Sequence, residues 1–503
     1  MEFNKALERF KEIIKLSNAY TYAMGVITFD SETAAPKNSV MGRANASEIF
    51  SGITYKLTVN EEYFEVLDTL SSNKDKLDAI TAREVELAVQ SLSQIRHIPI
   101  EEYTEYRKTL TYSQNAWVQA KRNDDYSIFA PYLEKIIAFH RRVASLVAPD
   151  MDPYDYWLDQ YEQELSTKTL DAFFDKVRAS IVPLIKRVSE RGDIIRTDFL
   201  ERHCPIELQR RLSDYVMQLM HISRDDCAIA ESEHPFTLEL DKHDVRITTH
   251  YHEERLISNL YSVIHEGGHA LYELNIGDDL IDTALAGGTS MSVHESQSRF
   301  YENIIGRSRA FVEILFPKIK ELFPEQYKDV SLDEFYLAVN KAQPSLKRMN
   351  ADELTYAMHI MVRYELEKRM MHGEITVDEL PAEWNRLYKE YLGIEVPSNR
   401  EGILQDVHWG GGMIGYFPSY ALGSAYGAQM VEAIKKDLDF DELIKNDRIN
   451  EITAWLTERI YRFGRLLKPG DAVRAATGKD FDPQYFIDYL TEKYTAIYGL
   501  DKE

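Results

Sequence analysis

Apolar residues recur three and four positions apart over most of the chain, the spacing that places them on one face of an α-helix. This pattern predicts successive amphipathic helices up to about residue 233 and again from about residue 253 to the end. Prolines and short polar clusters predict breaks near residues 34–36, 148–150 and 203–205. A mainly helical, all-α fold is therefore expected.

Residues 236–251 depart from this pattern, because apolar and polar residues alternate there on either side of a polar turn. Alternation with a period of two predicts a β-hairpin. The edge of such a hairpin can offer main-chain hydrogen bonds to an extended peptide, although a hairpin that only covers the core fits the pattern equally well. A glycine-rich and aromatic stretch, residues 408–427, forms a second interruption.

The chain of 503 residues is longer than one hydrophobic core usually serves, which favours a two-lobed molecule with room for a deep groove. We expect a single domain over residues 1–503. Within it we expect a helical N-terminal part over 1–233, a part with the hairpin over 234–430, and C-terminal helices over 431–503.

Charge and cysteine content narrow the classes of partner and compartment. The net charge of −24, from 59 basic and 83 acidic residues, repels nucleic acid and acidic membrane surfaces, so neither is an expected partner. Cys204 and Cys227 are too few for a disulfide framework, which suits a reducing compartment. The N-terminus lacks a signal-peptide pattern, and no window approaches the roughly 18 apolar residues that span a bilayer. We expect a soluble, cytoplasmic protein.

A candidate metal site lies on the helix that follows the hairpin. His265 and His269 are four residues apart, so both side chains project from one helix face and can bind a single ion. Glu266 beside them can hold the metal-bound water, as in other H-E-x-x-H helices. The alternative is a coincidental pair of surface histidines.

The surrounding helix supports the metal interpretation. At about 100° per residue the two histidines lie opposite an apolar stripe that faces the core. The stripe consists of Leu256, Leu260, Val263, Gly267, Leu271 and Leu274. Gly267 and Gly268 each cost this helix about 1 kcal/mol relative to alanine, so we expect another element or a substrate to approach closely there.

A third ligand should come from another segment and leave one coordination position open for water. Glu295 is the best candidate, but Ser292-x-x-Glu295 is also a capping-box pattern, in which the carboxylate would bind the backbone of Ser292. Glu273 is a weaker rival because it lies on the same helix as the histidines, and Glu302 is a better one. His294 is expected outside the ligand set.

Six separate segments resemble one known family. They are His234-Pro235-Phe236, Asp244-Val245-Arg246-Ile247-Thr248, His265-Glu266-Gly267-Gly268-His269, His294-Glu295-Ser296-Gln297, Arg348-Met349-Asn350-Ala351-Asp352 and Gly402-Ile403-Leu404-Gln405-Asp406-Val407-His408-Trp409. Through them the chain resembles, over essentially its whole length, the carboxypeptidase Taq family of H-E-x-x-H metallocarboxypeptidases. Phe29, Ala35 and Lys347 depart from the family's usual residues, which affects local packing and not the metal site.

The resemblance implies that His265, His269 and Glu295 bind one zinc ion per chain, with cobalt as a substitute. It also implies a mainly helical, two-lobed fold with a deep groove, similar to the angiotensin-converting enzyme and neurolysin group, and a homodimer. His408 and Tyr420 are the implied donors to the oxyanion of the tetrahedral intermediate, with Tyr416 as competitor to Tyr420. Without the resemblance, this stretch fits an aromatic packing patch.

A carboxypeptidase must bind a free terminal carboxylate, and in an acidic protein this requires a local cation. Arg348 fits this role, with Asp352 one turn away to orient its guanidinium; an ordinary surface ion pair of the two is the alternative. Arg246 in the hairpin is a second candidate, with a similar alternative.

The sequence thus predicts a zinc carboxypeptidase that removes C-terminal residues from peptides with broad tolerance, with Glu266 as the general base. An endopeptidase or oligopeptidase with the same metal chemistry is the first alternative. A non-catalytic helical metal-binding protein is the second.

Overall fold

The computed structural model describes residues 1–502, without the side chains of residues 193 and 502, and it is mainly helical as expected. The first four helices carry a small hydrophobic core of their own, which includes Phe10, Leu67 and Leu92. Their bounds are α1 (Phe3–Thr33), α2 (Val40–Thr58), α3 (Glu61–Ser71) and α4 (Ala79–His97). The main core begins at Ile98 and continues to Leu500, so the remaining elements share one interior.

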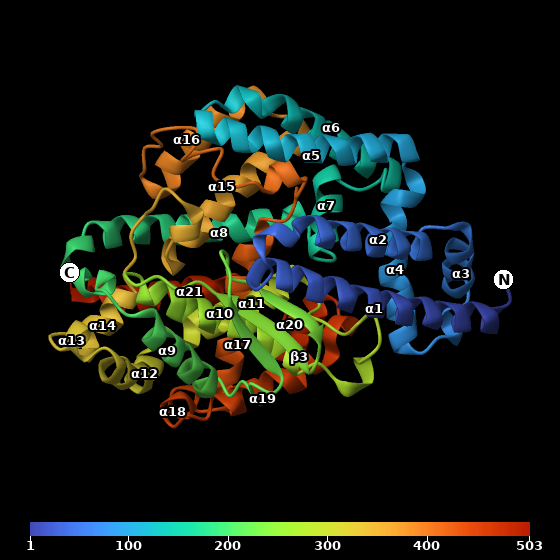
Figure 1. Ribbon diagram of the computed structural model, residues 1–503. Helices are drawn as coiled ribbons and strands as arrows, with labels where there is room; N and C mark the ends of the chain where they lie inside the picture. Colours follow the sequence, from blue (N-terminus) through green and yellow to red (C-terminus); the bar gives the residue numbers. More distant parts are fainter. Residues whose placement is uncertain (503) are drawn as a thin grey trace.

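Of the helices that precede the sheet in sequence, α5 and α6 lie far from the sheet, α8 runs between those two helices and the sheet, and α9 lies on the side of the sheet, near α12 (Figure 1). Their bounds are α5 (Ile100–Asn123), α6 (Ala130–Val147), α7 (Pro153–Tyr161), α8 (Thr167–Ser189) and α9 (Ile206–Leu219). The predicted breaks near 34–36, 148–150 and 203–205 all fall between helices.

The sheet has three strands in the order β1-β3-β2. Strands β2 (Thr237–Asp241) and β3 (Asp244–Thr249) pair antiparallel, which confirms the predicted hairpin. Strand β1 (Cys227–Glu231) pairs with β3 in parallel and was not predicted. With only five residues, two of them alanines, β1 shows no clear alternation of apolar and polar positions. Its pairing with β3 therefore decides its conformation.

The helices that follow the sheet include the candidate metal helices. Their bounds are α10 (Leu256–Leu274), α11 (Met291–Arg299), a π-helical turn (Phe300–Ile305), α12 (Arg309–Leu322), α13 (Pro324–Tyr327), α14 (Leu332–Val339), α15 (Glu353–His372) and α16 (Leu380–Leu392). The last helices are α17 (Pro418–Asp437), α18 (Phe440–Lys445), α19 (Ile449–Arg459), α20 (Pro469–Thr477) and α21 (Gln484–Tyr498). Across the described residues, no helix combines the length and apolar character needed to cross a bilayer.

Helix α1 packs on the hairpin and so connects the sheet to the N-terminal helices. A Cβ at Gly25 would overlap Cδ2 of Leu240, so the missing side chain allows this close approach. Phe29 packs edge-on against Phe236 with ring centroids 6.1 Å apart. The two rings therefore form part of the contact between α1 and the hairpin.

Candidate metal centre

Helix α10 is buried on nearly every side. The predicted stripe of Leu256, Leu260, Val263 and Leu271 lies in the main core. Tyr272, on the opposite side with the histidines, is fully buried as well. The two histidines therefore face other helices and are mostly buried, which argues against a pair of surface histidines.

Both glycines of the pentapeptide allow close contacts, as expected. A Cβ on Gly268 would lie 2.7 Å from the carbonyl oxygen of Gln297 and 2.8 Å from Cα of Ser298, both on α11. A Cβ on Gly267 would lie 2.7 Å from Cε of Met220. Helix α11 can lie this close to α10 only because residue 268 has no side chain, and this approach brings Glu295 to the histidines.

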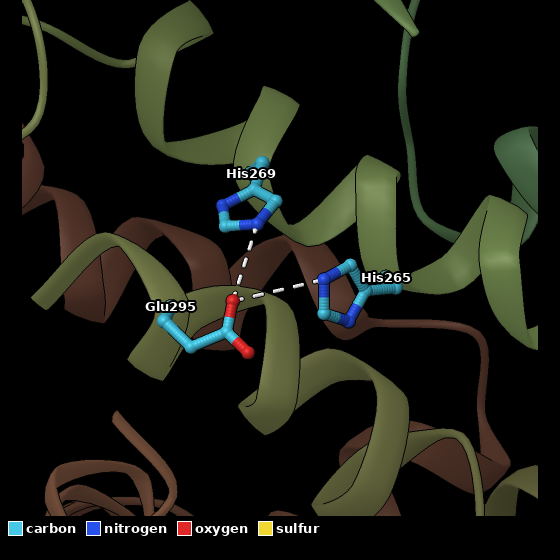
Figure 2. Close-up of side chains that lie close together, drawn as sticks. All are labelled: His265, His269 and Glu295. Atoms are coloured by element: carbon cyan, nitrogen blue, oxygen red, sulfur yellow. Dashed lines mark ion pairs between the residues drawn. The ribbon is translucent and has the colours of Figure 1, made fainter. Parts of the chain in front are cut away.

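Glu295 reaches both histidines from α11 (Figure 2). Its Oε2 lies 3.7 Å from Nε2 of His265 and 3.6 Å from Nε2 of His269. Among the described residues, these three side chains are the one group whose ligand atoms lie within 4.8 Å of one another. The capping-box alternative is wrong, because Ser290 is the N-cap of α11 and accepts a hydrogen bond from Val293 N–H.

The donor set fits zinc. Four ligands at about 2.0–2.2 Å around a tetrahedral ion lie about 3.3 Å apart, so separations of 3.6 and 3.7 Å need only a small contraction. Two imidazoles and one carboxylate leave the fourth position open, as in catalytic zinc sites, whereas calcium and magnesium prefer oxygen ligands. Although burial opposes ionisation, Arg299 and His265 hold the pKa of Glu295 well below its usual range, so the carboxylate is charged.

Glu302, considered above as a ligand, instead orients His265. Its Oε2 accepts a hydrogen bond of 2.9 Å from Nδ1 of His265, which leaves the lone pair of Nε2 free for the ion. Arg299 and Arg307 donate to the same carboxylate at 3.3 and 3.2 Å. The π-helical turn of residues 300–305 contains Glu302, and such turns frequently occur at functional sites.

His269 is oriented by a longer chain of contacts. Its Nδ1 lies 2.5 Å from Nδ1 of His294, and Nε2 of His294 lies 2.6 Å from Oε1 of Glu273. If His294 donates from Nε2 to Glu273, its Nδ1 accepts the proton of His269 Nδ1, and Nε2 of His269 is free for the ion. The structure thus places His294 and Glu273 outside the ligand set.

Glu266 connects the metal helix to the hairpin. The hydroxyl of Thr237, at the start of β2, donates to Oε2 of Glu266 at 2.7 Å. Burial raises the pKa of Glu266, which makes its carboxylate a stronger base than one in water. Thr237 was not singled out in the sequence, since no spacing rule links a strand residue to a side chain 29 positions later.

Arg348 lies in a buried network whose carboxylate is Asp406. Its Nη2 and Nε donate to Oδ1 of Asp406 at 2.9 and 3.1 Å, and Nη1 donates to the hydroxyl of Tyr356 at 3.0 Å. Arg363 donates to the other oxygen of Asp406 at 2.7 Å. The predicted Asp352 partner is wrong, because Asp352 caps α15 and accepts from Thr355 N–H.

His408, Tyr416 and Tyr420 form an aromatic cluster beside Arg348. The ring of His408 lies 5.7 Å from that of Tyr416 and 6.3 Å from that of Tyr420, and the Arg348 guanidinium lies 4.9 Å from the ring of Tyr420. Burial lowers the pKa of His408 to about 4, so it is neutral near pH 7. The guanidinium of Arg299 lies 4.5 Å from the ring of Tyr356, which connects this cluster to Glu295.

Arg246 is bound within its own hairpin. Its Nε and Nη2 donate to the two oxygens of Asp244 at 2.7 and 2.8 Å, and its guanidinium lies 5.2 Å from the ring of Phe29. Among the described residues, no hydrogen bond or ion pair joins Arg246 to the metal group or to Arg348. Contacts through Arg299 and Tyr356 therefore link the metal group to Arg348, whereas Arg246 takes no part in these contacts.

The chain is similar to known proteins over nearly its whole length. Residues 9–494 match a family described as Carboxypeptidase Taq (M32) metallopeptidase. The chain is 40% identical to Carboxypeptidase 1 of Bacillus subtilis over 99% of its own length and 100% of the relative. It is 36% identical to Thermostable carboxypeptidase 1 of Pyrococcus furiosus, covering 95% of this chain and 96% of that one.

Solved structures show the same fold. The M32 carboxypeptidase of Deinococcus radiodurans R1 superposes with a TM-score of 0.94 at 33% identity, over 98% of this chain and 100% of that one. These matches span the metal helices, the hairpin and the Arg348 network alike. The chain therefore belongs to the carboxypeptidase Taq (M32) family of metallopeptidases.

Proposed function

We propose that the protein is a zinc carboxypeptidase that hydrolyses the C-terminal peptide bond of peptides with broad side-chain tolerance, with one zinc ion per chain or cobalt in its place. The observation that carries the proposal is the convergence of His265, His269 and Glu295 next to a buried arginine network. The metal group supplies hydrolytic chemistry, and the arginines supply recognition of a terminal carboxylate.

Glu266 is the proposed general base and acid. A bound zinc ion supplies Lewis acidity, which acidifies a water molecule and polarises the scissile carbonyl. Glu266 accepts the proton of the attacking water and later delivers it to the leaving amine. The raised pKa of its buried carboxyl group suits both transfers, and the hydroxyl of Thr237 keeps one oxygen in place.

Arg348 is the proposed anchor for the terminal carboxylate. Arg348 and Arg363 share the single carboxylate of Asp406, so the network contains two positive charges and one negative charge. A substrate carboxylate would compensate the remaining charge, and a guanidinium can bind it through two parallel hydrogen bonds. Arg348 is the member of the pair with some exposure, because its side chain is 10% exposed and that of Arg363 is 0% exposed.

His408 and the neighbouring tyrosines are the proposed donors to the developing oxyanion. Burial raises the pKa of both Tyr416 and Tyr420, so each keeps its hydroxyl proton and can donate it. Neutral His408 also has one N–H to donate. Strand β2 is the proposed partner of an extended substrate, because it lies at the edge of the sheet and is joined to Glu266 through Thr237.

The proposal extends to the remaining expectations for this family. Both cysteines, Cys204 and Cys227, are buried and unpaired, which supports a reducing compartment such as the cytoplasm. We also propose that the protein is a homodimer, that its substrates are peptides with a free terminal carboxylate, and that its chain forms a single peptidase domain.

A pair of otherwise identical peptides, one with a free and one with an amidated C-terminus, tests the exopeptidase assignment. We expect release of the terminal amino acid from the free form and a loss of most activity on the amide, because Arg348 has no carboxylate to bind. Mass spectrometry of the products identifies the cleaved bond. Equal cleavage of both forms at internal bonds would instead show an endopeptidase.

Replacing Glu302 with glutamine tests its role as the support of His265. We expect the zinc dissociation constant to rise by about 10- to 100-fold, the usual cost of losing such a contact, with one ion still bound at saturation. Competition with a chromogenic chelator measures this constant. Glu313→Gln on α12, which replaces a half-buried carboxylate paired with Arg309, is the control. Unchanged affinity would contradict the role, and complete loss of metal binding would make Glu302 a ligand.

A further inference from the structure

The loop from His408 to Tyr416 contains two of the proposed oxyanion donors but little regular structure. It begins with a short 3-10 turn, His408–Gly411, and continues through Gly412 and Gly415, whose φ angles are +75° and +90°. Glycine adopts such angles easily, so the backbone does not by itself fix the direction of the two side chains. Contacts from outside the loop must do so.

One buried carboxylate contacts both ends of this loop. Glu367, on α15, is 0% exposed. Its Oε1 accepts a hydrogen bond of 2.7 Å from the indole nitrogen of Trp409, and its Oε2 accepts one of 2.9 Å from Gly415 N–H. Trp409 directly follows His408, and Gly415 directly precedes Tyr416. A single side chain thus fixes the chain neighbours of both proposed donors.

The third partner of Glu367 is the hydroxyl of Tyr154, which donates to Oε2 at 2.7 Å. The indole and the backbone N–H can only donate, so both need an acceptor, and a carboxylate provides one oxygen for each. Burial raises the pKa of Glu367 to about 7, so ionisation here is costly. Glu367 contacts neither the metal group nor Arg348. Its two hydrogen bonds with the loop therefore explain why a carboxylate is buried at this position.

We propose that Glu367 is a positioning residue for peptide hydrolysis, which holds His408 and Tyr416 in place through Trp409 and Gly415. The proposal rests on the proposed function, because it assumes that His408 and Tyr416 act on the developing oxyanion. Glu367 itself touches no substrate. It acts through the loop, and none of the six family-like segments quoted above includes it.

Replacing Glu367 with glutamine tests this role with almost no change in volume. An amide has one acceptor oxygen, so in either orientation its NH2 group meets a donor of the loop, the indole of Trp409 or the amide of Gly415. Contacts to the oxyanion form only in the transition state. We therefore expect kcat to fall by about 10- to 100-fold with little change in KM.

Glu365→Gln is a matched control on the same helix. Glu365 lies two residues earlier, and burial also raises the pKa of its carboxyl group. It accepts a hydrogen bond of 2.7 Å from the hydroxyl of Tyr391, away from the loop, and an amide oxygen can still accept that bond. We expect the kcat of this variant to match the wild-type value within about twofold, as for substitutions far from special features.

A double-mutant cycle with His408→Ala distinguishes positioning from general stability. If Glu367 acts through the loop, its replacement lowers kcat less in the His408→Ala background than in the wild type. Wild-type kcat for Glu367→Gln, or the same fold loss in both backgrounds, would overturn the proposal. Wild-type protein without carboxypeptidase activity would overturn the proposed function itself, and His408→Ala with full kcat would overturn the role of His408 and with it the proposal for Glu367.

NMR of the tryptophan indole groups gives a readout that does not depend on activity. The chain has 5 tryptophans, and Trp409→Phe identifies the Trp409 signal. We expect Glu367→Gln to shift this signal and Glu365→Gln to leave it unchanged. If Glu367→Gln does not fold, Trp409→Phe replaces it, because that change removes one of the two tethers. Wild-type kcat in folded Trp409→Phe would then overturn the proposal.

Discussion

Replacing Glu266 with glutamine is expected to lower kcat by about 10²- to 10⁴-fold, the usual contribution of a general base, while one metal ion stays bound. The amide oxygen can still accept the hydrogen bond from Thr237, so the side chain keeps its place. What it loses is the ability to take a proton from water. Release of the terminal residue from a peptide, together with metal analysis of the same sample, measures both quantities.

The control for this experiment is Glu254→Gln, an exposed change shortly before α10. It should match the wild type in both activity and metal content. If Glu266→Gln retains kcat within a few-fold, then Glu266 is not the base. Loss of the ion from Glu266→Gln would show instead that Glu266 supports metal binding.

Replacing Arg348 with methionine is expected to lower kcat/KM for a peptide with a free C-terminus by about 10²-fold or more, which corresponds to about 3 kcal/mol. The loss should be much smaller for the amidated peptide, so that the preference for the free carboxylate disappears. Asp406 keeps its bonds to Arg363, at 2.6 and 2.7 Å, and the variant should therefore stay folded. Thermal melting checks this.

Arg348→Lys is the informative companion. Lysine keeps the positive charge but cannot form two parallel hydrogen bonds, so we expect an intermediate kcat/KM. An equal loss on the free and amidated peptides would contradict the role of Arg348 as the carboxylate anchor. Such a result would indicate that the arginine only maintains the network with Asp406 and Tyr356.

Local patterns in the sequence predicted the features that depend on local spacing. The helices, the breaks between them and the hairpin all follow from periodicity and turn residues. The close approach at Gly268 was also predictable, because a glycine in a helix interior needs a compensating contact. Residues four apart on one helix must lie on the same face, which is why His265 and His269 could be paired.

The features that depend on long-range packing were not predictable in the same way. Arg348 was paired with Asp352, one turn away, whereas its carboxylate partner is Asp406, 58 positions later. Helix α15 begins only after Asp352, so the assumed helical spacing between the two residues does not exist. Glu302 was similarly considered as a metal ligand. The π-helical turn instead places its carboxylate at Nδ1 of His265.

A single measurement tests the central claim most directly: an anomalous difference map across the zinc absorption edge, from crystals of protein with demonstrated activity. We expect one peak per chain, about 2.0–2.2 Å from Nε2 of His265, Nε2 of His269 and a carboxylate oxygen of Glu295. A peak at any other position, or no peak across either the zinc or the cobalt edge in crystals of active protein, would contradict the proposal that this triad holds the hydrolytic metal.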